Sequence, residues 1–249
     1  DDAVATLSLG MALHGHRILQ RVHHAADPQT LPRLAHLIIG PSGQGKTFLA
    51  ERLATLGLAG DPLPFVRIDM NNVTEAGYYG LDLPTVAIGG AISAAGGEQG
   101  VAEGSAILFC DEVDKVRSCG SPNHREIGGQ YAQAAMLDLV DGQVLTADLY
   151  GRGPDGRNLR TTIRFETQGL WVMAAGAFSG LSVMLERRLR TPRRIGFAAA
   201  AESPLDASLR RADVLRDVTI DDLVAYGMLP ELCGRFLSVV VLDPLRAAD

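Results

Sequence analysis

The stretch GPSGQGKT at residues 40–47 decides how the rest of this chain is interpreted, because it satisfies the pattern GxxxxGK[ST] in full. It follows a short apolar run at 36–39 and precedes a segment with helical spacing at 45–56. Glycines let the backbone curl so that its N–H groups point at one anion, and the N-terminus of the following helix adds positive potential. The stretch therefore predicts a phosphate-binding loop between a strand and a helix.

Two side chains of this loop suit a nucleoside triphosphate. Lys46 offers a compact positive charge for the β- and γ-phosphates, and the hydroxyl of Thr47 can ligate Mg²⁺. An ordinary glycine turn before a helix is the alternative, but the predicted strand and helix on either side favour nucleotide binding. The predicted nucleotide-binding residues are Pro41, Ser42, Gly43, Gln44, Gly45, Lys46, Thr47 and Phe48.

A pair of acidic residues follows another apolar run. The residues ILFC at 107–110 lead directly into Asp111 and Glu112. Ligands of open α/β sheets bind at the carboxyl edge of the strands, so we expect Asp111 to hold Mg²⁺ together with Thr47 and Glu112 to orient or deprotonate the attacking water. Solvated acids at an exposed strand end are the alternative. Combined with the phosphate loop, the pair favours ATP hydrolysis over simple nucleotide binding.

The order of apolar and helical segments predicts an α/β fold. Because the predicted strands and helices alternate, we expect one domain over 1–249 with a mainly parallel, five-stranded sheet and helices on both faces. The glycine-rich tract 77–104 is expected to hold one helix. Strands are predicted at 36–39, 65–69, 106–110, 170–174 and 236–242, and helices at 3–24, 45–56, 83–94, 129–140 and 181–189.

Composition narrows the class of protein. The formal net charge of −6 argues against a general nucleic-acid binder, which usually carries a basic surface. The chain has no apolar run of about twenty residues of the kind that crosses a membrane. Cys110, Cys119 and Cys233 show no CxxC spacing, which favours packed thiols in a reducing compartment, the cytoplasm.

A group of histidines lies on the first predicted helix. Metal coordination is one interpretation of four imidazoles so close together, but no carboxylate partner recurs at ligand spacing. We therefore interpret them as solvated or partly packed side chains. The four are His14, His16, His23 and His24.

With these motifs in place, the sequence resembles the ClpX family of AAA+ protein unfoldases over nearly its whole length. TEAGYYG at 74–80 is similar to the family's first pore loop, whose aromatic residue grips the translocating polypeptide; here the residues are Tyr78 and Tyr79. PELCGR at 230–235 resembles the motif that carries the arginine finger, which makes Arg235 the side chain that reaches nucleotide bound by a neighbouring subunit. The predicted catalytic residues are then Lys46, Asp111, Glu112 and Arg235.

A further stretch matches the family's partner-docking loop. Ile195, Gly196 and Phe197 correspond to the loop with which ClpX docks onto the ClpP peptidase ring. The resemblance implies a homo-hexamer that binds ATP or ADP with Mg²⁺, acts on protein substrates and delivers them to a ClpP-type peptidase. Near residues 174–178 many AAA+ proteins carry a polar sensor, but AAGAF has no Asn or Thr, so no sensor is assigned.

The resemblance also implies domains outside this sequence. The family has a zinc-binding N-terminal domain and a C-terminal lid domain, and neither is expected within residues 1–249. Because the chain begins Asp1-Asp2 without a methionine, we expect a fragment.

Two rival functions use the same nucleotide motifs. An AAA+ protein that remodels nucleic acid fits the phosphate loop, although the acidic net charge and the aromatic loop count against it. A scaffold that binds nucleotide only to hold an oligomer together is the second rival. The intact acidic pair and the predicted arginine finger argue for turnover instead.

Overall fold

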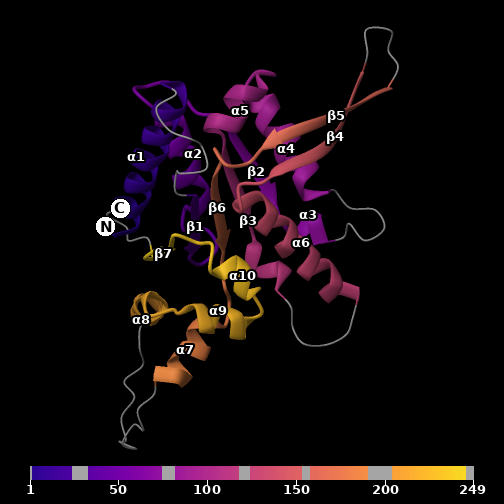
Figure 1. The fold of residues 1–249 in the computed structure, drawn as a ribbon. Coiled ribbons are helices and arrows are strands. Elements are labelled where there is room, and N and C mark those ends of the chain that lie inside the picture. The colour runs from indigo at the N-terminus through magenta and orange to yellow at the C-terminus, as the bar shows by residue number, and fades with distance from the viewer. Residues whose placement is uncertain are drawn as a thin grey trace, which may run out of the picture.

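A computed structural model describes residues 2–23, 33–74, 82–117, 124–152, 158–189 and 204–244. Within these ranges the protein has one five-stranded sheet, one two-stranded hairpin and helices on both sides of the sheet (Figure 1). None of the described helices is long and apolar enough to cross a membrane.

The sheet is parallel throughout, in the strand order β2-β3-β6-β1-β7. Every residue of the three central strands is buried, which explains why they read as continuous apolar runs without alternation. The strands are β1 (Leu34–Ile39), β2 (Phe65–Asp69), β3 (Ile107–Asp111), β6 (Trp171–Gly176) and β7 (Ser238–Val241). The predicted five-stranded parallel sheet is therefore confirmed, with strand ends that move by one or two residues.

Helices cover the two faces of the sheet unequally, as Figure 1 shows. One face packs against α1 (Asp2–Val22) and α2 (Lys46–Leu56) through a small core that includes Leu7, Leu53 and Trp171. The other face carries the larger core, to which α4 (Leu83–Ala94) and α6 (His124–Val140) contribute. This three-layer arrangement leaves the carboxyl ends of the strands as the edge where connecting loops can form a site.

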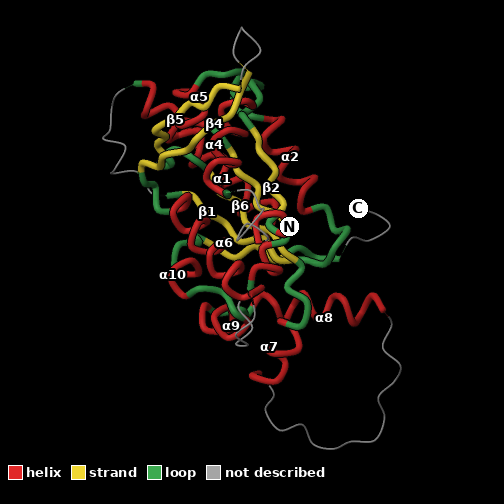
Figure 2. The backbone as a smooth tube through the Cα atoms, turned by 90° about the vertical axis from the view of Figure 1, so that its right-hand side faces the viewer, coloured by secondary structure: helices red, strands yellow, loops and turns green. Residues whose placement is uncertain are grey.

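Several helices, most of them short, were not predicted. They lack a long apolar period, and glycines weaken the helical signal in the segment that forms α5. A sequence signal did exist for α9, where Thr219 and Asp222 form a reciprocal capping box. These elements are α3 (Asn71–Thr74), α5 (Gln99–Ser105), the 3₁₀ helix η2 (Val113–Val116), α8 (Pro204–Arg216), α9 (Ile220–Tyr226) and α10 (Pro230–Cys233). Both views place α7 (Leu181–Leu189), α8 and α9 together at one end of the molecule (Figure 2).

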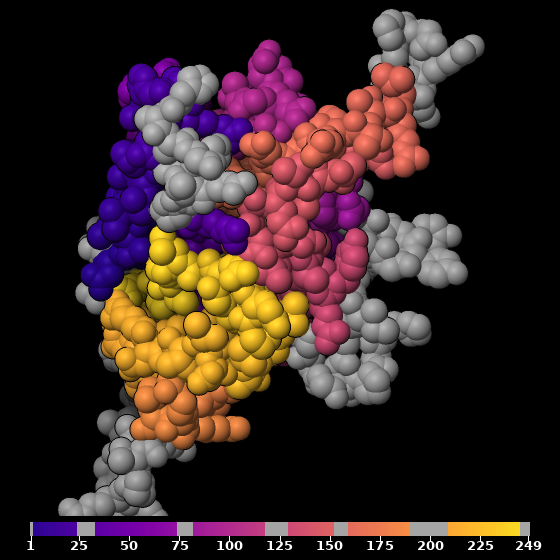
Figure 3. All heavy atoms as spheres, in the orientation of Figure 1, coloured from indigo at the N-terminus to yellow at the C-terminus, as the bar shows by residue number. Residues whose placement is uncertain are grey.

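A long antiparallel hairpin stands away from the body. Strands β4 (Val144–Arg152) and β5 (Asn158–Glu166) pair over their whole length, and their far end projects from the surface in the space-filling view (Figure 3). Tyr150 near that end is 72% exposed, whereas Ala147 and Phe165 are buried where the hairpin joins the core. Hydrophobic packing therefore holds β4 as far as Leu149, and the hairpin is exposed from Tyr150 outward.

The histidine interpretation needs a correction for one residue. His14 is fully buried rather than solvated or partly packed, and its Nε2 lies 3.0 Å from the backbone oxygen of Ser105. Its ring also lies against Trp171, whose Nε1 donates to Nδ1 of His36 at 2.9 Å. Burial lowers the pKa of both His14 and His36 to about 4, so both rings are neutral in the folded protein near neutral pH.

Candidate nucleotide site

The loop between β1 and α2 has the backbone that its glycines predict. Gly43 and Gly45 adopt φ angles of +81° and +80°, in the left-handed region that residues with a Cβ disfavour. A Cβ added at either glycine would meet nothing within 4 Å. These glycines are therefore required by backbone conformation and not by crowding, which leaves open space beside the loop.

The side chain of Lys46 lies within this loop. It is buried, and its Nζ donates to the carbonyl oxygens of Gly40 at 2.5 Å and Pro41 at 2.9 Å. Burial lowers the pKa of Lys46, while the nearby carboxylates, Asp111 first, oppose that shift. A cation held against the loop in this way can turn toward an anionic ligand without crossing the site.

The last residue of β3 faces the same loop. The hydroxyl of Thr47 donates to Oδ2 of Asp111 at 3.3 Å, and the other carboxylate oxygen accepts the backbone N–H of Glu112 at 3.0 Å. Asp111 is 8% exposed, so this carboxylate has little contact with solvent. A hydroxyl and a carboxylate oxygen side by side are hard oxygen ligands, and they fit Mg²⁺.

Glu112 follows in a strained backbone conformation. Its φ of +59° places a residue with a Cβ in the left-handed region, a conformation often kept for functional reasons. Its Oε2 accepts a hydrogen bond from Nδ2 of Asn71, whose backbone N–H is in turn held by Asp69 at 2.9 Å. Asn71 is not among the predicted residues, although its position just beyond β2, next to β3 in the sheet, could have indicated it.

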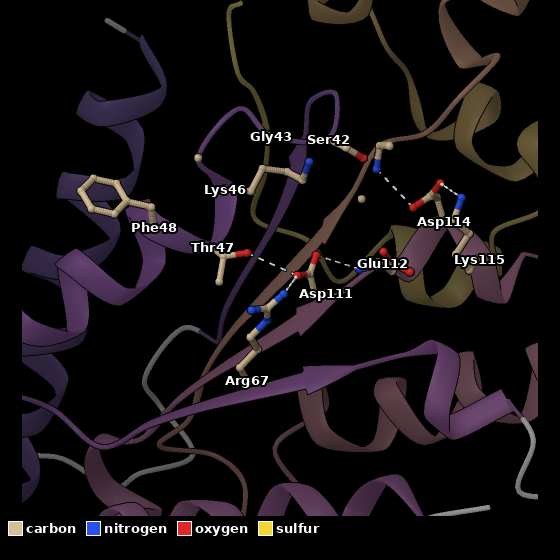
Figure 4. Close-up of a pocket in the computed structure, with 13 residues that line it drawn as sticks. Ser42, Gly43, Lys46, Thr47, Phe48, Arg67, Asp111, Glu112, Asp114 and Lys115 are labelled. Atoms are coloured by element: carbon tan, nitrogen blue, oxygen red, sulfur yellow. Dashed lines mark hydrogen bonds and ion pairs between the residues drawn. The ribbon is translucent and has the colours of Figure 1, made fainter. Parts of the chain in front are cut away.

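Residues of the phosphate loop line one cavity of about 460 Å³ together with Asp111 and Glu112 (Figure 4). Of the predicted nucleotide-binding residues, Pro41 and Gln44 are not part of its lining. Arg67, Asp114, Lys115, Gly176 and Ala177 line it without having been predicted. The predicted residues in the lining are Ser42, Gly43, Gly45, Lys46, Thr47, Phe48, Asp111 and Glu112.

The buried carboxylate of Asp114 lies beside residues 176–177, the segment in which no polar sensor is assigned. Oδ1 of Asp114 accepts the backbone N–H of Ala177 at 3.2 Å, and the side chain is 3% exposed. A Cβ on Gly176 would lie 2.7 Å from that same oxygen. At residues 176–177, where no polar sensor is assigned, the cavity wall therefore consists of backbone atoms and the carboxylate of Asp114.

Phe48 is part of the cavity lining and is largely exposed. Its ring is 65% exposed and points away from Asp111 in Figure 4. The guanidinium of Arg52 lies over the ring, 5.9 Å from its centroid. An exposed aromatic ring at the cavity wall is suited to stacking with a base or sugar.

Arg235 lies just after α10 and is not part of the cavity lining. It forms an ion pair with Asp141, a carboxylate that Arg33 also contacts at 3.1 Å. The hydrogen bond to Asp141 raises the pKa of Arg235, so the guanidinium of Arg235 stays protonated. The arginine-finger prediction requires Arg235 to contact nucleotide bound by a neighbouring subunit. Its position outside the cavity of its own subunit is compatible with that role.

Five predicted residues lie outside the described ranges: Tyr78, Tyr79, Ile195, Gly196 and Phe197. Cys119 is also outside them, whereas Cys110 and Cys233 are buried free thiols. Burial raises the pKa of Cys110 to about 12 and that of Cys233 to about 11, which keeps both protonated.

Comparison with known proteins places the chain in a family. The family model for the AAA domain (Cdc48 subfamily) matches residues 32–239. The ATP-dependent Clp protease ATP-binding subunit ClpX 3 of Methylococcus capsulatus is 36% identical over 217 residues, which cover 85% of this chain and 48% of that protein. ClpX of Porphyromonas gingivalis is 30% identical over 249 residues, 98% of this chain and 57% of the relative.

A further relative agrees with these two. ClpX 2 of Wolinella succinogenes is 31% identical over 247 residues, which cover 97% of this chain and 56% of the relative. The chain thus spans about half the length of the curated relatives it matches. The chain belongs to the AAA family as an AAA+ ATPase domain, and it is similar to the ClpX ATP-binding subunits.

Proposed function

We propose that the cavity binds ATP and hydrolyses it to drive the unfolding of proteins. The observation that supports this best is the convergence of Lys46, Thr47, Asp111 and Glu112 on one cavity at the carboxyl edge of the sheet. A loop for phosphate, an oxygen pair for a divalent cation and a carboxylate for water are the parts that phosphoryl transfer requires.

Each side chain has a distinct task in this proposal. Lys46 leaves the carbonyl oxygens of Gly40 and Pro41 and pairs with the β- and γ-phosphates. Thr47 and Asp111 would hold Mg²⁺, which when bound neutralises charge on the phosphates. Glu112 accepts a proton from the attacking water after its carboxylate leaves Asn71.

The mechanical part of the proposal concerns residues beyond the cavity. The relatives' names describe ATP-binding subunits of an ATP-dependent protease, which supports a protein substrate. In a ring of six subunits, Tyr78 and Tyr79 would contact the translocating polypeptide and Arg235 would reach the nucleotide of the next subunit. Ile195, Gly196 and Phe197 would dock onto a ClpP-type peptidase through exposed apolar side chains.

One experiment separates this proposal from its rivals. Full-length protein is incubated with ATP and a stable fluorescent protein that carries a degradation tag, with and without a ClpP-type peptidase. We expect ATP-dependent loss of fluorescence, and fragments only when the peptidase is present. ATP hydrolysis stimulated by DNA but not by denatured protein would support nucleic-acid remodelling, and nucleotide binding without turnover would support a scaffold.

A further inference from the structure

An arginine reaches into the nucleotide cavity from the strand next to β3. Arg67 lies on β2, paired in register with Phe109, and its side chain is 55% exposed. Its Nη2 lies 2.8 Å from Oδ2 of Asp111. Figure 4 shows the guanidinium pointing from β2 toward that carboxylate, beside the hydroxyl of Thr47.

The two oxygens of Asp111 are both engaged, but by different kinds of group. Oδ1 accepts the backbone N–H of Glu112, a contact that fixes the orientation of the carboxylate. Oδ2 accepts from both Thr47 and Arg67, so the guanidinium holds the oxygen that lies beside the Thr47 hydroxyl. A divalent cation bound between Thr47 and Asp111 needs this same oxygen.

Two cations cannot share that oxygen at low cost. A guanidinium and a divalent ion within a few ångströms repel each other, and the low exposure of Asp111 limits how much water can screen them. Arg67 itself is more than half exposed, so its long side chain can move outward without leaving a buried charge unpaired. A divalent cation can therefore displace the guanidinium of Arg67 from Asp111 at low cost.

We infer that Arg67 acts as an internal competitor of Mg²⁺ for Asp111, and so sets the Mg²⁺ concentration that nucleotide binding requires. The inference rests on the proposed function of this cavity. In the structure, Arg67 supplies the positive charge beside Oδ2 of Asp111. Binding of Mg²⁺ and nucleotide to the cavity would displace the guanidinium from Asp111. Arg67 thus acts through Asp111, the proposed metal ligand, and is a positioning residue.

The test measures binding rather than turnover. Binding of a fluorescent ADP analogue to full-length protein is followed as Mg²⁺ is raised, and also in excess EDTA. Arg67→Met removes the charge but keeps the unbranched apolar stem of the side chain. Arg160→Met is the matched control, because Arg160 also pairs with a carboxylate, Asp148, but on the hairpin far from the cavity.

We expect Arg67→Met to lower the Mg²⁺ concentration at half-maximal binding by about fivefold, the effect of losing one partly exposed ion pair. Binding in EDTA should match the wild type, and Arg160→Met should leave both values unchanged. An unchanged Mg²⁺ midpoint in Arg67→Met would overturn the inference. Weaker binding in EDTA would also overturn it, because Arg67 would then be a phosphate ligand.

A second readout separates this inference from the proposed function. If the wild type binds no nucleotide at any Mg²⁺ concentration, the proposed function fails. Binding of Mn²⁺ alone, followed by electron paramagnetic resonance, still compares wild type with Arg67→Met. Tighter Mn²⁺ binding by the variant supports the competition, and equal binding rejects it.

Discussion

The amide of Asn71 donates a hydrogen bond to the carboxylate of Glu112, and this contact joins the end of β2 to the group proposed to activate water. Asn71 is itself oriented by Asp69, whose Oδ1 accepts both its backbone and its side-chain N–H. The observed contact occupies a carboxylate oxygen that would otherwise be available to accept a proton. This hydrogen bond therefore restrains the carboxylate of Glu112.

Removing this restraint should raise the basal rate of ATP hydrolysis. A hydrogen bond to a charged group contributes about 1.5 kcal/mol or more, so we expect Asn71→Ala to increase turnover without substrate by roughly tenfold or more. Phosphate release at saturating ATP measures the rate. Asn72→Ala, a change at the exposed neighbour on α3, is the control. Slower hydrolysis in Asn71→Ala would mean that the contact orients Glu112 for catalysis.

Neutralising Glu112 should separate nucleotide binding from hydrolysis. Glu112→Gln keeps the shape and the contact partner but removes the proton acceptor, so we expect ATP hydrolysis to fall by about 10²- to 10⁴-fold. ATP affinity should stay within a small factor of the wild type, because Lys46 and the loop are unchanged. Equilibrium binding and phosphate release measure the two quantities, and normal turnover would remove Glu112 from the proposed role.

A methyl group at Gly176 should disturb the cavity wall. The added Cβ would lie 2.7 Å from Oδ1 of Asp114 and 2.8 Å from the ring of Phe178, so neighbouring groups must shift. We expect Gly176→Ala to lower the free energy of unfolding by about 1–3 kcal/mol and to weaken nucleotide binding. Gly151→Ala on β4 meets nothing within 4 Å and serves as the control in urea unfolding. Equal stability of the two variants would contradict the expected crowding.

Stability should fall in mild acid because of two buried imidazoles. His14 and His36 have a folded-state pKa of about 4, lower than the unfolded value of 6.5, so the unfolded chain takes up protons first as the pH falls. The stabilisation is present above about pH 6.5 and is lost progressively toward pH 4, by up to about 3 kcal/mol for each ring.

Urea unfolding at several pH values checks this dependence. His36→Gln should flatten the decline between pH 6.5 and 5, although it also lowers stability at neutral pH because Trp171 loses its acceptor. His16→Gln, a change at an exposed ring that contacts only Gln20 among the described contacts, should leave the slope unchanged. A slope that both variants share with the wild type would show that other groups cause the acid sensitivity.

The aromatic loop should affect protein unfolding more than ATP hydrolysis. Tyr78→Ala removes the proposed grip on the polypeptide and leaves the nucleotide cavity intact. We expect basal ATP hydrolysis to stay near the wild-type rate while unfolding of a tagged fluorescent protein slows about tenfold or more, a loss of roughly 1.4 kcal/mol or more. Unchanged unfolding would remove Tyr78 from the gripping role.

The sheet and the main groups of the cavity could be predicted from local patterns in the sequence. Apolar runs such as ILFC at 107–110 are local signals of buried parallel strands, and the spacing within GPSGQGKT specifies a backbone that places Lys46 and Thr47. Asp111 could be placed beside Thr47 because the carboxyl ends of parallel strands share one edge. Short-range patterns were sufficient in each of these cases.

Which distant side chains meet could not be predicted, because those contacts form only when the elements pack together. Arg67 belongs to β2 and Asn71 begins α3, and the local sequence pattern does not separate either of them from an ordinary surface residue. Their roles depend on β2 lying next to β3 in the sheet, a pairing between segments about forty residues apart along the chain. The burial of His14 likewise depends on α1 packing against Trp171 and α5. Contacts between segments distant in sequence arise from packing, which local propensity does not encode.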